Sequence, residues 1–165
     1  MSPDQTALVQ ATWQRVVPIA DAAARSFYDR LFEIDPQLRL LFSSVDLDAQ
    51  RRKLIQALAL VVGSLEHIND VIPSLEALGR RHAGYGVTDA HYDTVRAALI
   101  STLQQGLGDV WTEEVKAAWV QAYSLVSGVM RAGTARAETG EAGTTISPLL
   151  PEDAVVSSRS LRGEI

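Results

Sequence analysis

The amino-acid sequence predicts a single all-α domain, and three observations lead to this prediction. Apolar residues recur three and four positions apart along most of the chain, which is the spacing of one face of a helix. No segment alternates apolar and polar residues in the way that a half-buried strand would. Proline, glycine and helix-capping residues divide the apolar segments into lengths that suit helices.

Seven helices are expected, and they cover, in order, about residues 3–17, 20–32, 37–42, 47–66, 73–82, 89–105 and 112–129. The first begins at Ser2, an N-cap residue, with Pro3 in the first helical position that proline favours. Pro18 breaks this helix because proline cannot continue the helical hydrogen-bond pattern. Asp35 and Pro36 end the second helix and begin the short third one.

The later helices are bounded by polar residues and glycines. Asn69 and Asp70 end the long fourth helix, and Gly84 ends the fifth. Thr88 or Asp89 caps the sixth helix. Acidic residues at the start of the seventh helix favour its formation there, because carboxylates interact with the positive end of the helix dipole.

The composition is typical of a soluble globular protein, with 47% hydrophobic and 21% charged residues among 165. The net charge of −5 gives no basic footprint, so nucleic acid is not an expected partner. The absence of cysteine excludes disulfides, cysteine-bound zinc, iron–sulfur clusters and thiol catalysis. The N-terminus lacks the pattern of a signal peptide, and no apolar run approaches the ~20 residues of a membrane span. We therefore expect a cytoplasmic protein without a membrane partner.

The composition divides the chain into two parts near Gly133. Residues 1–133 carry the helical pattern and form the expected domain. Residues 134–165 are rich in Ala, Thr, Gly, Glu and Ser and contain no aromatic residue, so we expect a disordered C-terminal tail.

His82 is the first candidate functional residue. It continues an apolar stripe formed by Leu75 and Leu78, so an imidazole occupies a position where the chain otherwise places leucine. A buried neutral imidazole needs a partner, which is either a backbone hydrogen-bonding group in an ordinary core or a metal ion.

Two polar residues, Tyr28 and Gln50, interrupt apolar stripes of the second and fourth helices. Buried phenol and amide groups cost roughly 1–3 kcal/mol when unpaired, so each should find a partner. They bond to the backbone or to each other, or they line a ligand cavity. Phe42 at the end of the third helix is either an ordinary core residue or a flat wall of that cavity.

The order of helices and several spaced motifs resemble the bacterial single-domain haemoglobins and the globin domains of flavohaemoglobins. The resemblance covers about residues 1–133. It implies a globin fold, a 3-over-3 helical sandwich around haem b (iron protoporphyrin IX). The matching motifs are Phe27-Tyr28-Asp29-Arg30-Leu31-Phe32, Asp35-Pro36, Leu41-Phe42, His91-Tyr92, Ala117-Ala118-Trp119 and Ala122-Tyr123.

The resemblance also implies roles for individual residues. His82 matches the proximal ligand of the iron and Phe42 the aromatic residue that packs on the haem face. Tyr28 and Gln50 match the distal tyrosine and glutamine, and Leu54 forms an apolar wall one turn later. Arg51 competes with Gln50 for the distal position, but the stripe that continues into Leu54 favours Gln50.

Cations near the expected haem are candidate partners of its propionates, because cations at a pocket rim pair with carboxylates. These are Lys53, Arg52 and Arg81, and each is alternatively an ordinary solvated surface charge.

One position departs from the family pattern on the proximal side. The family has a glutamate late in the last helix, bonded to the tyrosine that matches Tyr92, whereas counting from Trp119 without gaps places Thr134 there. Glu138 lies one turn later, in a stretch not expected to be helical. We therefore expect a weaker electronic push on the iron and a ligand-binding protein in preference to a peroxidase.

The resemblance implies reversible binding of O2, and of NO and CO, at a pentacoordinate iron with distal Tyr/Gln hydrogen bonding. One alternative is a nitric oxide dioxygenase that depends on an external reductase. Others are a haem-based gas or redox sensor module and a haem-free helical signalling domain. A monomer or weak homodimer is expected.

Overall fold

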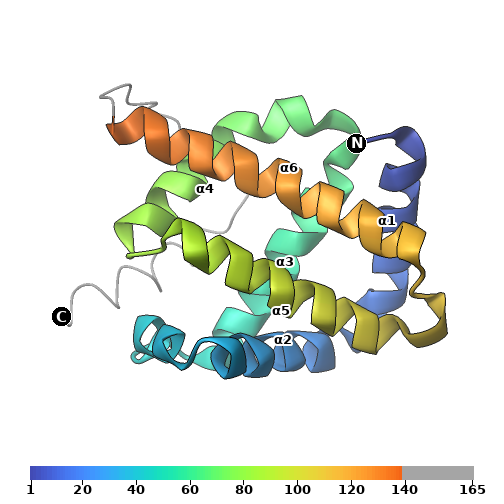
Figure 1. The fold of residues 1–165 in the computed structure, drawn as a ribbon, viewed down its shortest axis with the longest axis horizontal. Coiled ribbons are helices and arrows are strands. Elements are labelled where there is room, and N and C mark those ends of the chain that lie inside the picture. Colours follow the sequence, from blue (N-terminus) through green and yellow to red (C-terminus); the bar gives the residue numbers. More distant parts are fainter. Residues whose placement is uncertain (139–165) are drawn as a thin grey trace.

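The structure is a computed structural model that describes residues 1–138, and within that range the chain is helical and contains no strand (Figure 1). The all-α prediction is confirmed. The helices are α1 (Pro3–Val16), α2 (Ala20–Ile34), α3 (Leu47–Gly63), α4 (Ile72–Gly84), α5 (Asp89–Leu107) and α6 (Glu113–Glu138). The 3-10 segments between them are η1 (Val17–Ile19), η2 (Pro36–Phe42), η3 (Leu65–Val71) and η4 (Gly108–Val110).

The early helix boundaries follow the expected capping chemistry. The Ser2 hydroxyl accepts a hydrogen bond from the Gln5 N–H at 3.2 Å, and the Gln5 side chain accepts one from the Ser2 N–H at 3.0 Å. The Asp35 carboxylate accepts from the Gln37 N–H at 3.1 Å and so caps η2. Pro18 falls within η1, where α1 gives way to α2.

The predicted helix over residues 47–66 is too long. α3 ends at Gly63, where the Ser64 hydroxyl donates to the Leu60 carbonyl oxygen at 2.7 Å. η3 follows as a separate segment, and its His67 leaves the helical region with φ −130° and ψ 42°. This break lets α4 begin in a new direction.

The last helix extends beyond the expected end of the domain. α6 continues through Gly133 to Glu138, five residues past the predicted boundary. Glu138, expected to lie outside a helix, is therefore the last residue of α6. The remainder of the predicted tail, residues 139–165, lies outside the described residues.

The main core joins α1, α2, α3, α5 and α6. At its centre, the rings of Trp13 and Trp119 lie 6.4 Å apart. A second apolar cluster connects η3 and α4 to α5 and α6 through Val71, Leu75, Tyr92 and Met130. α6 therefore belongs to both clusters and packs against both α4 and α5. In Figure 1, α5 runs alongside α6.

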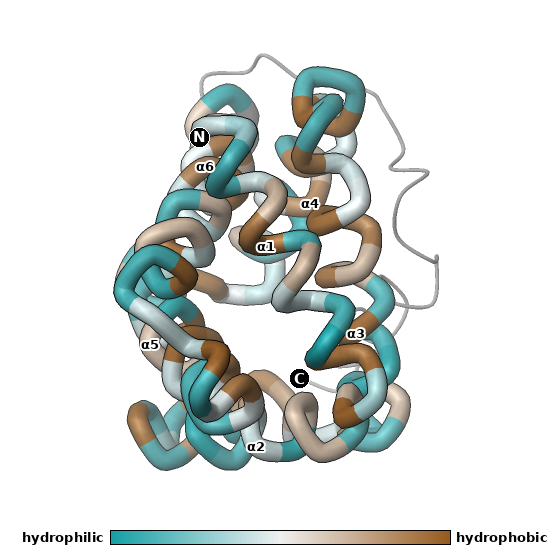
Figure 2. Tube along the Cα trace, turned by 90° about the vertical axis from the view of Figure 1, so that its right-hand side faces the viewer, coloured by the Kyte–Doolittle hydropathy of each residue, from teal (hydrophilic) through white to brown (hydrophobic). Residues whose placement is uncertain are grey.

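Apolar and polar residues follow one another along each helix, as expected of helices that bury one face (Figure 2). Within residues 1–138, no single helix is both long enough and apolar enough to cross a membrane. The segments 47–63 and 65–84 meet that condition only when taken together, and they are bent by 104° relative to each other.

Candidate functional site

His82 lies near the C-terminal end of α4, and its imidazole is held by the backbone of the same helix. The Nδ1 atom is 2.9 Å from the Leu78 carbonyl oxygen. A carbonyl only accepts hydrogen bonds, so Nδ1 carries the proton and Nε2 keeps its free electron pair. The sequence analysis offered a backbone group or a metal ion as the partner of His82, and the structure contains the backbone hydrogen bond. This bond occupies Nδ1 and leaves Nε2 in the form that binds metals.

The surroundings of His82 favour its neutral form. Burial lowers the pKa of His82 below its usual value, and the bond to the Leu78 carbonyl acts in the opposite direction. The positive charge of Arg81 lowers the pKa further. A neutral imidazole is the form in which histidine serves as a ligand.

Tyr28 in α2 and Gln50 in α3 are brought together, and their side chains share a hydrogen bond. Tyr28 is buried, with 4% of its surface exposed, and Gln50 is partly buried. Burial raises the pKa of Tyr28 to about 12, against the opposing effects of the Gln50 bond and the Arg51 charge. The phenol therefore keeps its proton at neutral pH and remains able to donate a hydrogen bond.

An aromatic cluster fixes the position of the Tyr28 ring. Phe27 contacts it edge-on with ring centroids 5.1 Å apart, and Phe42 does so from η2 at 5.7 Å. Phe42 also meets Phe32 at 5.7 Å. Leu54, one turn beyond Gln50, is partly buried and packs against the same core. The structure thus places Tyr28, Gln50, Phe42 and Leu54 on connected elements, whereas His82 comes from α4.

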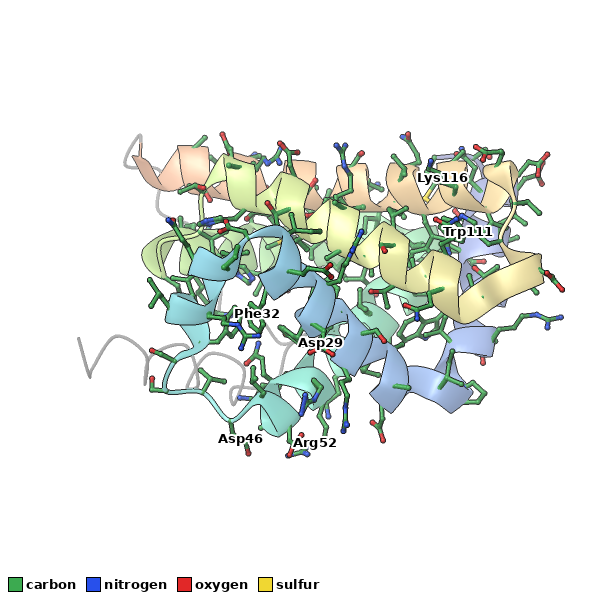
Figure 3. All side chains as sticks on the ribbon, turned by 60° about the horizontal axis from the view of Figure 1, so that its bottom comes forward. Asp29, Phe32, Asp46, Arg52, Trp111 and Lys116 are labelled. Carbon is green, nitrogen blue, oxygen red and sulfur yellow. The ribbon has the colours of Figure 1, made fainter. Side chains whose placement is uncertain are left out.

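The cations named from the sequence have different environments. Arg52 is exposed at the outer edge of the molecule near the start of α3 (Figure 3). Arg51 is paired with Asp48, while Lys53 is partly buried. Arg81 is partly buried, and its Nη1 atom is buried without a hydrogen-bond partner among the described residues. An unpaired buried guanidinium nitrogen is costly, so Arg81 is the cation best suited to receive an anion.

Tyr92 is buried in the second cluster, and its surroundings contain Tyr123, which belongs to one of the matching motifs, and Arg131, which the sequence did not indicate. Tyr123 donates a hydrogen bond to the Tyr92 carbonyl oxygen at 2.6 Å, and the Arg131 guanidinium lies 4.8 Å from the centre of the Tyr92 ring. Arg131 also lies 3.6 Å from a carboxylate oxygen of Asp89. The Tyr92 hydroxyl is buried and has no partner within residues 1–138.

Thr134 does not occupy the place of a partner to the Tyr92 hydroxyl. Its own hydroxyl donates to the Gly79 carbonyl oxygen at 3.1 Å and lies 3.3 Å from that of Met130. The expected helical spacing from Val126 and Val129 continues to Met130 and Gly133. This signal could have shown that α6 continues past residue 129, where the last helix was expected to end.

The described residues offer few protein ligands to a metal ion. Within the range that the structure describes, no group of three or more His, Asp or Glu side chains could hold a metal ion.

A protein-family model described as Globin matches residues 25–130, which is more than half of the chain. The chain belongs to the globin family. This globin is similar to the Flavohemoprotein of Bordetella parapertussis, with 33% identity over 153 residues that cover 88% of the chain and 38% of that protein. It thus spans less than half the length of that relative.

A second relative is similar in length to this globin. The Anaerobic nitrite reductase NSHB5 of Oryza sativa subsp. indica is 28% identical over 137 residues, covering 79% of this chain and 93% of that one. Among solved structures, the neuroglobin of the marine acoel Symsagittifera roscoffensis aligns with a TM-score of 0.70 over 79% of this chain and 97% of that one. Its identity of 17% makes this a likeness of fold. The predicted globin resemblance and fold are confirmed.

Proposed function

We propose that this globin binds haem b through His82 and reversibly binds O2 and other diatomic ligands, including NO and CO, at a pentacoordinate iron. The observation that carries the proposal is the Nδ1 hydrogen bond of His82 to Leu78, which leaves Nε2 as a neutral nitrogen ligand. Haem, when bound, would supply an iron atom that takes a diatomic gas as a ligand.

Arg81 supports the fit of haem to this chain independently of His82. Its buried Nη1 lacks a partner among the described residues, and a haem propionate would supply the missing carboxylate. Lys53 and Arg52 remain weaker candidates for the same role, because Arg52 is exposed and gains little from a single ion pair in water.

The distal side of the proposed site consists of Tyr28, Gln50, Phe42 and Leu54. The neutral Tyr28 hydroxyl and the Gln50 amide are donors that would bond to bound O2 and slow its release. Phe42 and Leu54 supply apolar surface of the kind that flanks a porphyrin and keeps water out. CO carries less negative charge when bound and gains less from the same donors.

Nitric oxide dioxygenation is a second candidate, and it uses the same residues. The similarity to a flavohemoprotein favours it, and an external reductase would supply electrons. Sustained consumption of NO in the presence of O2 and an added reductase would support this activity. Oxidation of a single equivalent of NO per protein would support ligand binding without turnover.

Absorption spectra of the ferric, ferrous, O2 and CO forms test the proposal. The wild-type protein is expected to show a Soret band after haem is supplied, and His82→Ala is expected to lose the spectra of the histidine-ligated forms. His67→Ala, which changes an exposed histidine of η3, is the matched control and should leave them unchanged. A wild type without a Soret band, or a His82→Ala variant with wild-type spectra, would refute the proposal.

A further inference from the structure

Helices α4 and α6 touch through their backbones at two glycines. A β-carbon on Gly79 of α4 would overlap the carbonyl group of Met130 in α6. Reciprocally, a β-carbon on Gly133 of α6 would overlap the backbone of Glu76 in α4. The two helices therefore lie closer together than any pair of larger residues at these positions would allow.

Two side chains of α6 fasten the same stretch of α4. The Thr134 hydroxyl donates to the Gly79 carbonyl oxygen at 3.1 Å. One turn away, Arg136 Nη1 lies 2.8 and 2.6 Å from the two carboxylate oxygens of Glu76, whose side chain is only 12% exposed. We call Glu76, Gly79, Gly133, Thr134 and Arg136 the α4–α6 clamp.

The clamp surrounds the carbonyl that orients His82. Leu78 lies between Glu76 and Gly79 along α4, and its carbonyl oxygen accepts the Nδ1 proton of His82 at 2.9 Å. The peptide unit of that carbonyl ends at the nitrogen of Gly79. Glycine is the residue whose backbone is least restrained, so the Leu78–Gly79 link would be the softest point of this turn without an external contact.

We propose that Thr134 is a positioning residue for His82. By holding the Gly79 carbonyl, it fixes the orientation of the adjoining Leu78 carbonyl and hence the direction of the imidazole ring. This inference rests on the proposed role of His82 as the iron ligand. Through this contact, α6 would influence the iron ligand His82 by way of the α4 backbone. The Tyr92 hydroxyl, which has no partner among the described residues, is not involved.

A pair of substitutions isolates the hydroxyl of Thr134. Thr134→Val removes the donor at nearly constant shape, and Thr134→Ser retains it. Thr94→Val is the matched control, because the Thr94 hydroxyl donates to a carbonyl oxygen of its own helix α5, that of Ala90, at 3.2 Å. The measurement is the iron–histidine stretching band in the resonance Raman spectrum of the ferrous, ligand-free protein.

In Thr134→Val, this band is expected to broaden and move to lower frequency, because a less ordered Leu78 carbonyl polarises the imidazole less. Thr134→Ser and Thr94→Val should match the wild type. An unchanged band in Thr134→Val, together with a lowered melting temperature, would overturn the proposal and leave Thr134 a purely structural residue.

Two further measurements keep the test decisive. Arg136→Met removes the ion pair with Glu76 at the exposed end of the clamp and should move the iron–histidine band to lower frequency by a smaller amount than Thr134→Val. An unmoved band in Arg136→Met counts against the proposal even when Thr134→Val does not fold. In haem-free protein, long-range ¹H–¹⁵N spectra of His82 report the Nδ1 hydrogen bond directly. They test the role of Thr134 separately from haem binding, so a protein that fails to bind haem refutes only the proposed function.

Discussion

The indole N–H of Trp119 in α6 donates a hydrogen bond of 2.9 Å to the hydroxyl oxygen of Thr12 in α1, and both side chains are buried. The Thr12 hydroxyl donates in turn to the Leu8 carbonyl oxygen at 2.7 Å. Thr12 thus acts as acceptor and donor at once, and it satisfies the one polar atom of a tryptophan that lies in the main core.

Replacing Thr12 with valine should lower the free energy of unfolding by about 1–3 kcal/mol. The substitution keeps the shape of the side chain but leaves the Trp119 N–H buried without an acceptor, which costs its full desolvation. Urea denaturation measures the change, with Thr94→Val as a control in which the lost bond is exposed and local. Equal denaturation midpoints for the two variants would contradict this prediction.

Alanine substitutions at two glycines of α6 should change stability in opposite directions. Gly133→Ala places a methyl group against the Glu76 backbone and should cost about 1–3 kcal/mol, because the helices must separate. At Gly128 a β-carbon meets nothing within 4 Å, so Gly128→Ala should stabilise the same helix by roughly 0.5–1 kcal/mol. Thermal unfolding of the two variants measures both effects. Similar melting temperatures would show that the α4–α6 contact is not tight.

Tyr28→Phe should accelerate O2 dissociation about tenfold in the haem-loaded protein. The expected factor corresponds to the loss of one hydrogen bond with a net value of roughly 1–1.5 kcal/mol. Gln50→Ala should accelerate it as well, because it removes the second donor and the partner of Tyr28. Stopped-flow mixing with CO or a reductant gives the dissociation rates. Unchanged rates in both variants would exclude these residues as distal donors.

Alkaline pH should destabilise the fold partly through Tyr28. The pKa of Tyr28 is about 12 in the folded protein against 10.0 for an unperturbed phenol, so the folded state holds the proton more tightly. The stability linked to this group is complete below pH 10 and declines as the pH rises towards 12. At pH 11 the loss is on the order of 1 kcal/mol.

Urea denaturation at pH 9 and pH 11 tests this linkage. Wild type should lose more stability between the two values than Tyr28→Phe, by the amount that belongs to Tyr28. Tyr92 and Tyr123, whose pKa values burial also raises, contribute equally to both proteins and cancel in the comparison. Identical losses in the two proteins would show that Tyr28 ionises in the folded state as easily as in the unfolded one.

Local sequence signals predicted the helices well but not every boundary. The caps at Ser2 and Asp35 are where the sequence placed them. The end of α3 was missed, because the apolar stripe continues past Gly63 into Leu65 while the backbone turns at Ser64. Periodicity reports which residues face the core, and it is insensitive to a break that preserves this face.

Gly133 shows a different limit of sequence analysis. The change of composition near Gly133, towards small and polar residues without aromatic ones, placed the end of the domain there. The structure uses Gly133 within α6 for close contact with α4, a role that depends on a residue 57 positions earlier. The sequence likewise left undecided whether Tyr28 and Gln50 bond to each other, because their pairing joins two helices that are separate in the sequence. The Arg131 contact with Tyr92 was not anticipated.

The hydrogen bond between Thr12 and Trp119 has a consequence for the folding of the chain while it is being synthesised. Its two residues are 107 positions apart, so at about 5–20 residues per second a ribosome needs roughly 5–20 s after Thr12 before Trp119 is joined to the chain. During that interval the apolar face of α1, which includes Val9 and Val16, cannot pack against α6. The packing of α1 is thus completed only when α6 has been made, and a chaperone that protects nascent chains would find a target in the apolar face of residues 3–16.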